Sequence, residues 1–587
     1  MTTRRATPDQ RLSSDVTILV LFAAAAAVAA VAYCCWSVAI HLLGDIPDPA
    51  SNAFARPGTW PGLAIVLTAL GESALVAVTT AVLRKRVRRH EIERRAKVMA
   101  PPRRLREVTG ADARKKARRL RGDLDVVRAS DIGLPMGPTV IGGQPVYMSW
   151  EDVGAVLGGP RTGKTASVAI GAVCAAPGPV IATSNKRDLH DHCRGVRESG
   201  GRRAWVSDLQ GRAGEPAQDW WWNILAGVDR LPTARRLAAY FQAETRIPDA
   251  KADNYFEGGA LELVALYLLA AAVSGGDIVH AYSWLSYDDC PVPARQLDDH
   301  HQPIAAAKVR TAQSLNVRQR DGLFDMARRM LTVLSDEQYA ATVLPPRRKI
   351  FDGDQSPLGA WQPDHGLPEF DPRAFVRSRD ALFLLSMEGP DSATALVTAL
   401  VGRCLDHAMA LAARSPGGRL RTPLVGILDE AANVCKLTDL PYLYSHLGSQ
   451  GIVLLTFLQS PAQASEVWTS NQLDQLLSAS NIHYYAGGIT DPRYLQALSE
   501  RIGDHDVDRW SASLGRGGSS RSQSWTREAT LPVNLLAELP KHLAIVCTTG
   551  NPPMLVRKND WRTTRYADAI TASLTRYAPP ADGKELL

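Results

Sequence analysis

The segment 158–165 has residue types and a spacing suited to binding phosphate. It reads G-G-P-R-T-G-K-T and matches the pattern G-x-x-x-x-G-K-[ST]. In this pattern the backbone N–H groups of residues 159–165 turn towards phosphate oxygens, the lysine reaches the β- and γ-phosphates, and the final hydroxyl completes a Mg²⁺ shell. The residues that we expect to hold ATP are Gly158, Gly159, Pro160, Arg161, Thr162, Gly163, Lys164 and Thr165. Thr165 is also a predicted Mg²⁺ ligand.

The residues on either side of this segment supply the strand and the helix that such a loop requires. The apolar run 155–157 suits a buried strand, and the small apolar residues 166–176 suit a packed helix. The alternative, a glycine-rich turn that matches by chance, does not account for this context.

A pair of acids far downstream could complete the same site. Asp429 and Glu430 follow the apolar run 424–428, which is the pattern of a Walker B strand. We expect Asp429 to hold Mg²⁺, directly or through water, and Glu430 to orient and deprotonate an attacking water. Acids at strand ends are common, so this interpretation depends on the phosphate loop upstream.

A further predicted strand, 452–457, is followed by Gln459. An amide one strand away from the acids could sense the γ-phosphate and couple hydrolysis to motion. A hydrogen-bonded strand end is the alternative. The predicted catalytic residues are therefore Lys164, Glu430 and Gln459.

Short β-type runs alternate with helical stretches, which predicts an α/β fold with a mostly parallel sheet. The nucleotide-binding domain is expected in two halves, residues 131–231 and 346–576. Between them, residues 232–345 are Ala-rich and amphipathic, which predicts an all-helical domain. Residues 577–587 are expected to form a tail.

Two apolar runs near the N-terminus, 16–43 and 60–83, are each long enough to cross a bilayer. A signal peptide and a buried hairpin are the alternatives. Between residues 84 and 121 the chain has 17 Lys and Arg against four acids, which predicts that this side, with both termini and the ATPase domain, is cytoplasmic. We expect residues 1–100 to form a two-helix anchor in the cell membrane and residues 101–130 a linker. Anionic lipid or nucleic acid could account for the positive charge of the linker.

The eight cysteines include no C-x-x-C pair, which suggests neither a disulfide framework nor a zinc ribbon. His190, His192 and Cys193, within the acidic segment 188–193, form a metal-like cluster, for which a solvated helix start is the alternative. Residues 505–528 are rich in Ser, Gly and Arg and predict a mobile loop. Its arginines could contact a phosphate backbone or remain solvated.

Three segments together resemble a known family. They are T-S-N-K-R-D-L at 183–189, L-D-E-A-A-N at 428–433 and G-I-V-L-L-T-F-L-Q-S-P-A-Q at 451–463. In this order, behind the apolar N-terminal runs, they resemble the type IV secretion and conjugation coupling proteins of the TraG/TraD class, which are P-loop membrane ATPases. The resemblance implies a RecA-like core with an all-helical insertion and a two-helix transmembrane anchor, assembled as a homo-hexameric ring. It also implies transfer of relaxase-bound single-stranded DNA, or of protein, to a type IV secretion channel and its relaxosome proteins.

The chain departs from the pattern of this family at one place. Some members carry an arginine just ahead of the Gly-Ile that corresponds to residues 451–452, where this chain has G-S-Q at 448–450. An arginine acting on a neighbour's nucleotide would then come from elsewhere, with Arg187, Arg403 and Arg501 as candidates.

Two other functions remain open at this point. An FtsK-like duplex DNA translocase would share the motor core but normally lacks a large helical insertion within it. A nucleotide-binding membrane receptor without motor activity would not need the intact pair Asp429 and Glu430. Both DNA and protein are compatible with the sequence as transported substrates.

Overall fold

The computed structural model describes residues 91–100, 102–214, 218–245, 254–354, 356–389, 392–515 and 518–579. The chain divides into two compact units, Met1–Arg94 and Arg95–Leu587. The predicted membrane spans 16–43 and 60–83 lie outside the described residues. The fold below is that of the second unit.

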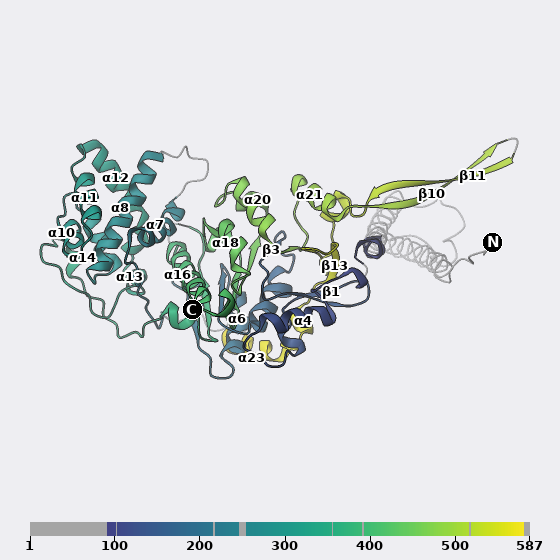
Figure 1. Cartoon of the computed structure of the whole chain (residues 1–587), viewed down its shortest axis with the longest axis horizontal. Helices are drawn as coiled ribbons and strands as arrows, with labels where there is room; N and C mark the ends of the chain where they lie inside the picture. The colour runs from purple at the N-terminus through teal and green to yellow at the C-terminus, as the bar shows by residue number, and fades with distance from the viewer. Residues whose placement is uncertain are drawn as a thin grey trace, which may run out of the picture. The chain divides into compact units, whose positions relative to one another are not determined.

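A nine-stranded sheet forms the centre of this unit, in the order β13-β12-β9-β3-β8-β7-β4-β6-β5 (Figure 1). The strands from β9 to β5 pair in parallel, and β12 pairs antiparallel with both β9 and β13. The strands are β3 Gly154–Leu157, β4 Val180–Ser184, β5 Ala204–Ser207, β6 Ala381–Leu385, β7 Leu424–Leu428, β8 Ile452–Leu458, β9 Ile482–Tyr485, β12 Leu543–Thr548 and β13 Met554–Arg557. The central strands β3, β4, β6, β7 and β8 are buried along their whole length, as expected of a parallel sheet with both faces covered. The predicted mostly parallel α/β fold is therefore confirmed.

The helices that accompany this sheet differ in length from one turn to 20 residues. They are α4 Gly110–Leu120, a π-helix Thr165–Ala169 continued by α5 Ile170–Ala175, α6 Asp188–Glu198, α16 Thr394–Ala413, α17 Ala431–Val434, α18 Leu440–Leu447, α19 Pro461–Ala464, α20 Ser470–Ala479, α21 Pro492–Ile502, α22 Val533–Ala537 and α23 Ala567–Tyr577. Short 3-10 turns occur at Pro102–Arg104, Ala129–Asp131, Thr332–Ser335, Pro416–Gly418 and Trp561–Thr563. A small antiparallel hairpin, β1 Leu134–Pro138 and β2 Pro145–Met148, precedes β3.

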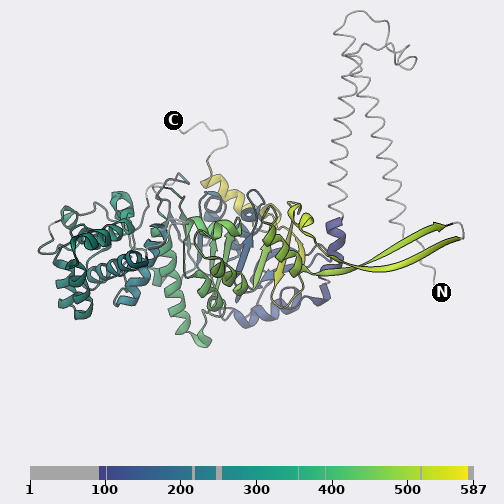
Figure 2. The ribbon, with the colours of Figure 1, turned by 90° about the horizontal axis from the view of Figure 1, so that it is seen from above.

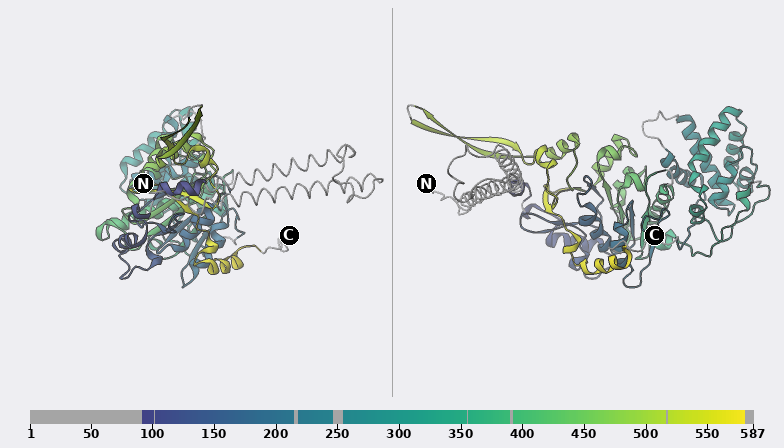
Figure 3. Two further views of the ribbon diagram at one scale, coloured as in Figure 1. Left: turned by 90° about the vertical axis from the view of Figure 1, so that its right-hand side faces the viewer. Right: turned by 180° about the vertical axis from the view of Figure 1, so that it is seen from behind.

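The chain between β5 and β6 forms the predicted all-helical insertion, and its helices gather into a bundle (Figures 1 and 3). Its helices are α7 Leu231–Thr245, α8 Asn254–Val273, α9 Ile278–Leu285, α10 Val292–Asp299, α11 Pro303–Gln313, α12 Val317–Met330, α13 Glu337–Ala341, α14 Pro357–Ala360 and α15 Pro372–Phe375. Helix α8 lies at the centre of the bundle, and its residues 263–271 are at most 2% exposed.

Two described helices are long and apolar enough to cross a membrane, namely Phe256–Val273 and Thr394–Ala413. In the most apolar stretch of each helix, 56% of the first and 72% of the second is buried inside the protein. We therefore interpret them as core helices of the insertion and of the sheet domain.

The prediction of a linker over residues 101–130 is wrong for α4. Ala113, Ala117 and Leu120 of this helix are buried in the same hydrophobic core as the sheet. These residues have the i, i+4, i+7 spacing of one helix face, but the basic residues between them dominate the composition. The folded unit consequently begins well before residue 131.

The prediction of a mobile loop over residues 505–528 is also wrong. The segment forms a long antiparallel ribbon, β10 Asp504–Gly515 and β11 Gly518–Ala529, which projects away from the sheet (Figure 2). The two strands pair residue by residue, from Asp504 with Ala529 to Gly515 with Gly518, so the Ser-rich composition does not prevent strand pairing here. At the base of the ribbon, Arg95 donates hydrogen bonds to the carbonyl oxygens of Ala529 (3.0 Å) and Thr530 (3.1 Å).

Two C-terminal elements had no clear sequence signal. The short strand β13 extends the sheet, and α23 packs on α6 through Ser573. The Ser573 hydroxyl accepts a hydrogen bond from the Gly195 N–H (2.9 Å) and donates one to the Asp191 carbonyl (2.7 Å). The C-terminal segment thus runs from the β13 edge of the sheet to helix α6.

Candidate nucleotide-binding site

The phosphate loop follows the carboxyl end of β3, which lies between β9 and β8 inside the sheet. The loop depends on a close backbone approach at Gly159, because a Cβ there would stand 2.1 Å from the Gly488 carbonyl oxygen. Within the loop, the Thr162 hydroxyl donates to the Gly159 carbonyl (2.8 Å). Gly163 has φ +80°, a conformation that glycine adopts without strain. Pro160, Arg161 and Gly163 are exposed at the tip of the loop.

Two of the predicted loop residues use their N–H groups within the protein. Gly158 donates to the Leu458 carbonyl (3.2 Å) and Gly159 to the Gly487 carbonyl (2.9 Å). The expectation that the Gly159 N–H points into the phosphate-binding concavity is therefore wrong. These two bonds hold the start of the loop to the strand ends on both of its sides.

Lys164 lies under the loop and is 9% exposed. Its ammonium donates to the Gly158 carbonyl and, at 3.4 Å, to the Leu458 carbonyl. Burial lowers the pKa of Lys164, and the carboxylates of Asp429 and Glu430 oppose that effect. The amine is thus desolvated and close enough to both acids of the predicted Walker B segment to interact with them electrostatically.

Asp429 and Thr165 meet although 264 positions separate them in the chain. The Thr165 hydroxyl donates to the Asp429 carboxylate at 3.3 Å. Burial, and then the charge of Glu430, raises the pKa of Asp429 to about 6, while Lys164 opposes this shift. A buried carboxylate beside a hydroxyl is the oxygen donor set that Mg²⁺ prefers. These two residues therefore fit the metal that the sequence predicted for them.

Glu430 and Gln459 also contact each other. Strand β8 lies between β3 and β7, so the residue after β8 is placed between the phosphate loop and the two acids. There the Gln459 amide donates to one carboxylate oxygen of Glu430 (2.8 Å). The structure thus brings Lys164, Glu430 and Gln459 together at one edge of the sheet.

Two residues of this site were missed in the sequence. The Asn185 amide donates to the second carboxylate oxygen of Glu430. The Lys558 ammonium donates to the carbonyls of Thr162 (2.6 Å) and Ala486 (2.8 Å). Burial, and then the charge of Lys164, lowers the pKa of Lys558 to about 8. Asn185 lies in the segment T-S-N-K-R-D-L and could have been found there, whereas Lys558 has no local signal.

An open cleft of about 540 Å³ adjoins the tip of the loop. It is lined by Gly159, Pro160, Gln459, Ser460, Ala462 and the residues 488–492. A ligand held by the loop can therefore extend along the ends of β8 and β9.

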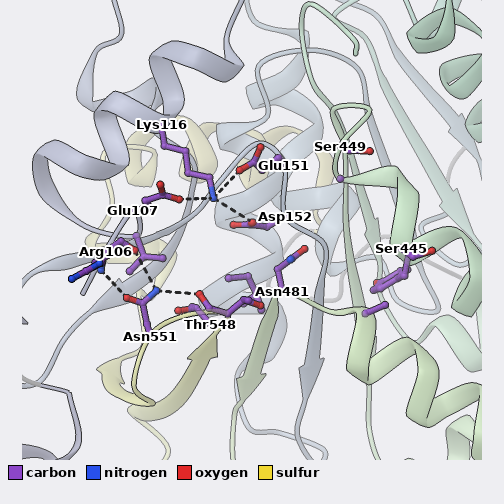
Figure 4. A pocket seen from close by; sticks show the side chains of 16 residues that line it. Arg106, Glu107, Lys116, Glu151, Asp152, Ser445, Ser449, Asn481, Thr548 and Asn551 are labelled. Atoms are coloured by element: carbon purple, nitrogen blue, oxygen red, sulfur yellow. Dashed lines mark hydrogen bonds and ion pairs between the residues drawn. The ribbon is translucent and has the colours of Figure 1, made fainter. Parts of the chain in front are cut away.

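A second cavity, of about 410 Å³, lies at the opposite edge of the sheet, where β3 and β9 begin (Figure 4). Its carboxylates are paired with one lysine, since Lys116 contacts Glu107 (3.4 Å), Glu151 (3.0 Å) and Asp152 (3.8 Å). It shares no lining residue with the cleft at the phosphate loop. We therefore do not assign it to the nucleotide.

The residues of the metal-like cluster have other partners. His190 contacts the Asp191 carboxylate (2.9 Å), and His192 contacts the Asp188 carbonyl (2.6 Å). The Cys193 thiol is buried at 3.9 Å from that of Cys174. In the part of the chain that the structure describes, no group of three or more such side chains could hold a metal ion.

Two of the three candidate arginines are engaged within the chain. Arg187 pairs with Asp191 (2.5 Å) and donates to the Tyr577 carbonyl (2.9 Å). Arg403 is 6% exposed and donates to the Ala226 carbonyl. Arg501 is exposed at the end of α21.

Comparison with protein families decides which class this site belongs to. A family described as "Type IV secretory system Conjugative DNA transfer" matches residues 104–328, and one described as "TraM recognition site of TraD and TraG" matches residues 423–541. Together the two matches span more than half of the chain. The protein belongs to the TraG/TraD class of conjugative coupling proteins. The sheet domain is accordingly a RecA-like P-loop core, as the sequence resemblance implied.

Solved structures with a similar chain path include "Bacterial conjugative coupling protein TrwBdeltaN70" in an unbound form, at 17% identity over 77% of this chain and 92% of that one, with a TM-score of 0.49. "Plasmid coupling protein TrwB in complex with ADP and Mg2+" matches at 16% identity over 78% and 93%, with a TM-score of 0.48. VirB4 of Thermoanaerobacter pseudethanolicus matches at 14% identity over 76% and 99%, with a TM-score of 0.40. The comparison with curated proteins gives no match.

Proposed function

We propose that this TraG/TraD-class protein is a membrane-anchored ATPase that drives a substrate into a type IV secretion channel. The substrate is DNA, as a relaxase-bound single strand, or protein, and the partners are channel and relaxosome proteins. The observation that carries the proposal is the meeting of Lys164, Thr165, Asp429, Glu430 and Gln459 at one edge of the sheet.

Each of these residues has a distinct role in the proposed reaction. Mg²⁺, when bound, neutralises and orients the triphosphate. Thr165 and Asp429 would hold that ion, and Lys164 would leave the loop carbonyls to contact the β- and γ-phosphates. Glu430 would accept the proton of the attacking water as its oxygen bonds to the γ-phosphorus and the bond to the β-phosphate oxygen breaks. Gln459 would report the loss of the γ-phosphate through its contact with Glu430.

We also propose the assembly and the location that the class implies. The runs 16–43 and 60–83 would form two membrane spans, with both termini and the ATPase domain in the cytoplasm. Their basic flank would lie against anionic lipid. Six copies would form a ring, so that hydrolysis at each site moves segments that line a central channel.

The proposal is tested with Lys164→Ala and Glu430→Gln in a transfer assay from donor to recipient cells. We expect both variants to abolish transfer, and Glu430→Gln to lower the ATP turnover of the purified protein by about 10²–10⁴-fold, the usual contribution of a general base. The control is that both variants reach the membrane fraction in wild-type amount. Wild-type transfer by either variant would refute the motor role, and a folded wild-type protein without turnover, with or without single-stranded DNA, would favour a receptor.

A further inference from the structure

The carboxylate of Glu430 is held from two opposite sides. Gln459 donates to its first oxygen (2.8 Å) and Asn185 donates to its second. Gln459 follows β8 and Asn185 follows β4, and these strands are the two neighbours of β7, which carries Glu430. The pairing of Thr183 with Leu428 brings the ends of β4 and β7 together.

The order of the strands implies that the contacts of Glu430 with Gln459 and with Asn185 pull its carboxylate in different directions. The phosphate loop follows β3, on the β8 side of β7, whereas β4 lies on the far side. The bond to Gln459 therefore keeps the carboxylate towards the loop, and the bond to Asn185 draws it away. A general base must have a carboxylate oxygen within hydrogen-bond reach of the water that it deprotonates.

The backbone of Glu430 shows that this position is tightly constrained. Its φ and ψ are 51° and 49°, the left-handed region, which costs a non-glycine residue free energy and persists only where the surroundings enforce it. The two side-chain contacts and the bonds from the N–H groups of Asn433 (2.8 Å) and Val434 (3.0 Å) to the Glu430 carbonyl supply such surroundings. Removing one amide can thus change where the carboxylate lies.

We infer that Asn185 is a positioning residue that holds the Glu430 carboxylate away from the attacking water, so that ATP turnover requires its release. The inference rests on the proposed ATPase function and adds a point of control to it. It also gives a physical role to the segment T-S-N-K-R-D-L, whose Asn185 is only partly buried and is followed by the exposed Lys186. A ligand or neighbouring subunit that moves this segment would free the base.

The test is steady-state ATP hydrolysis by the full-length protein in detergent, without DNA. Asn185→Ala is expected to raise kcat roughly tenfold, the factor that one hydrogen bond to a charged group controls. KM for ATP is expected to stay within about twofold, because Asn185 is not part of the phosphate loop. Asn185→Asp, which places a carboxylate against Glu430, is a second variant expected to give the same increase.

Two controls separate a restraint from a general effect on folding. Asn551→Ala removes an amide with comparable hydrogen bonds, to Arg106 and Thr549, at the opposite edge of the sheet and is expected to leave kcat unchanged (Figure 4). Asn185→Ala is expected to give no increase in kcat when it is added to Glu430→Gln, and a gain confined to proteins that keep Glu430 shows that Asn185 acts through that residue.

The outcomes distinguish this inference from the proposed function. A wild-type protein that turns over ATP, with unchanged or lower kcat in both Asn185 variants, would overturn the restraint but leave the ATPase intact. A wild-type protein without turnover would instead remove the proposed function itself.

Discussion

Replacing Asp429 by asparagine should stabilise the protein while removing a carboxylate ligand of the proposed Mg²⁺ site. Folding raises the pKa of this carboxyl from 3.8 to about 6 because the group is buried beside Glu430. Since each pH unit of difference corresponds to about 1.4 kcal/mol, the ionised carboxylate costs the fold about 3 kcal/mol at pH 8. The attraction of Lys164 is already included in that pKa, and the amide oxygen of the variant can still accept the Thr165 hydrogen bond.

The sign of this effect with pH follows from the direction of the shift. Because the folded state holds the proton more tightly, wild-type stability falls as pH rises from about 4 to about 6 and is then constant. The stability advantage of Asp429→Asn over the wild type should therefore be about 3 kcal/mol at pH 8 and roughly half of that at pH 5.

Thermal unfolding in EDTA without nucleotide measures this difference. At pH 8 we expect Asp429→Asn to raise Tm by roughly 3–6 °C, and by about half as much at pH 5. Asp474→Asn, at an exposed aspartate of α20, is the matched control and should leave Tm unchanged. An equal or lower Tm for Asp429→Asn at pH 8 would show that the carboxylate is not a strained, buried charge in the absence of metal.

Two further predictions concern the phosphate loop. Lys558, whose pKa is lowered to about 8, should lose its proton as pH rises, so kcat/KM for ATP should fall above about pH 8. Lys558→Arg, which stays charged, should remove this fall at alkaline pH. A wild-type pH profile of kcat/KM that is flat from about pH 7 to about pH 9.5 would contradict this prediction. Gly159→Ala should weaken ATP binding at least about tenfold, measured by titration calorimetry, because its Cβ would overlap the Gly488 carbonyl at 2.1 Å and force the loop to shift. The matched control is Gly171→Ala in helix α5. The added Cβ would meet nothing nearer than Pro135, at 3.9 Å, so the affinity for ATP should not change.

The position of Gln459 illustrates what sequence reasoning could and could not supply. The apolar run before it predicted a strand, and the resemblance to coupling proteins suggested a role, but a hydrogen-bonded strand end was an equally acceptable interpretation. The sheet order places β8 between β3 and β7, and this alone directs the amide to Glu430.

The predictions for residues 101–130 and 505–528 were wrong for a common reason. In α4 three apolar residues are spaced along one face among many basic ones, and in the β10–β11 ribbon serines occupy strand positions. Composition averages over such spacing, whereas burial and strand pairing respond to it.

By itself, the sequence determined the phosphate loop, the apolar strand before Asp429 and Glu430, the parallel α/β fold and the helical insertion. All of these are local patterns, because glycine spacing and apolar runs constrain the backbone where they occur. Only the tertiary structure decided that Asn185 holds Glu430 and that Lys558 holds the loop. These partners are 245 and 396 positions apart in the chain. Asparagine and lysine are common in loops, so a functional role for these two residues can be recognised only when the fold places one beside a buried carboxylate and the other beside the carbonyl groups of the phosphate loop.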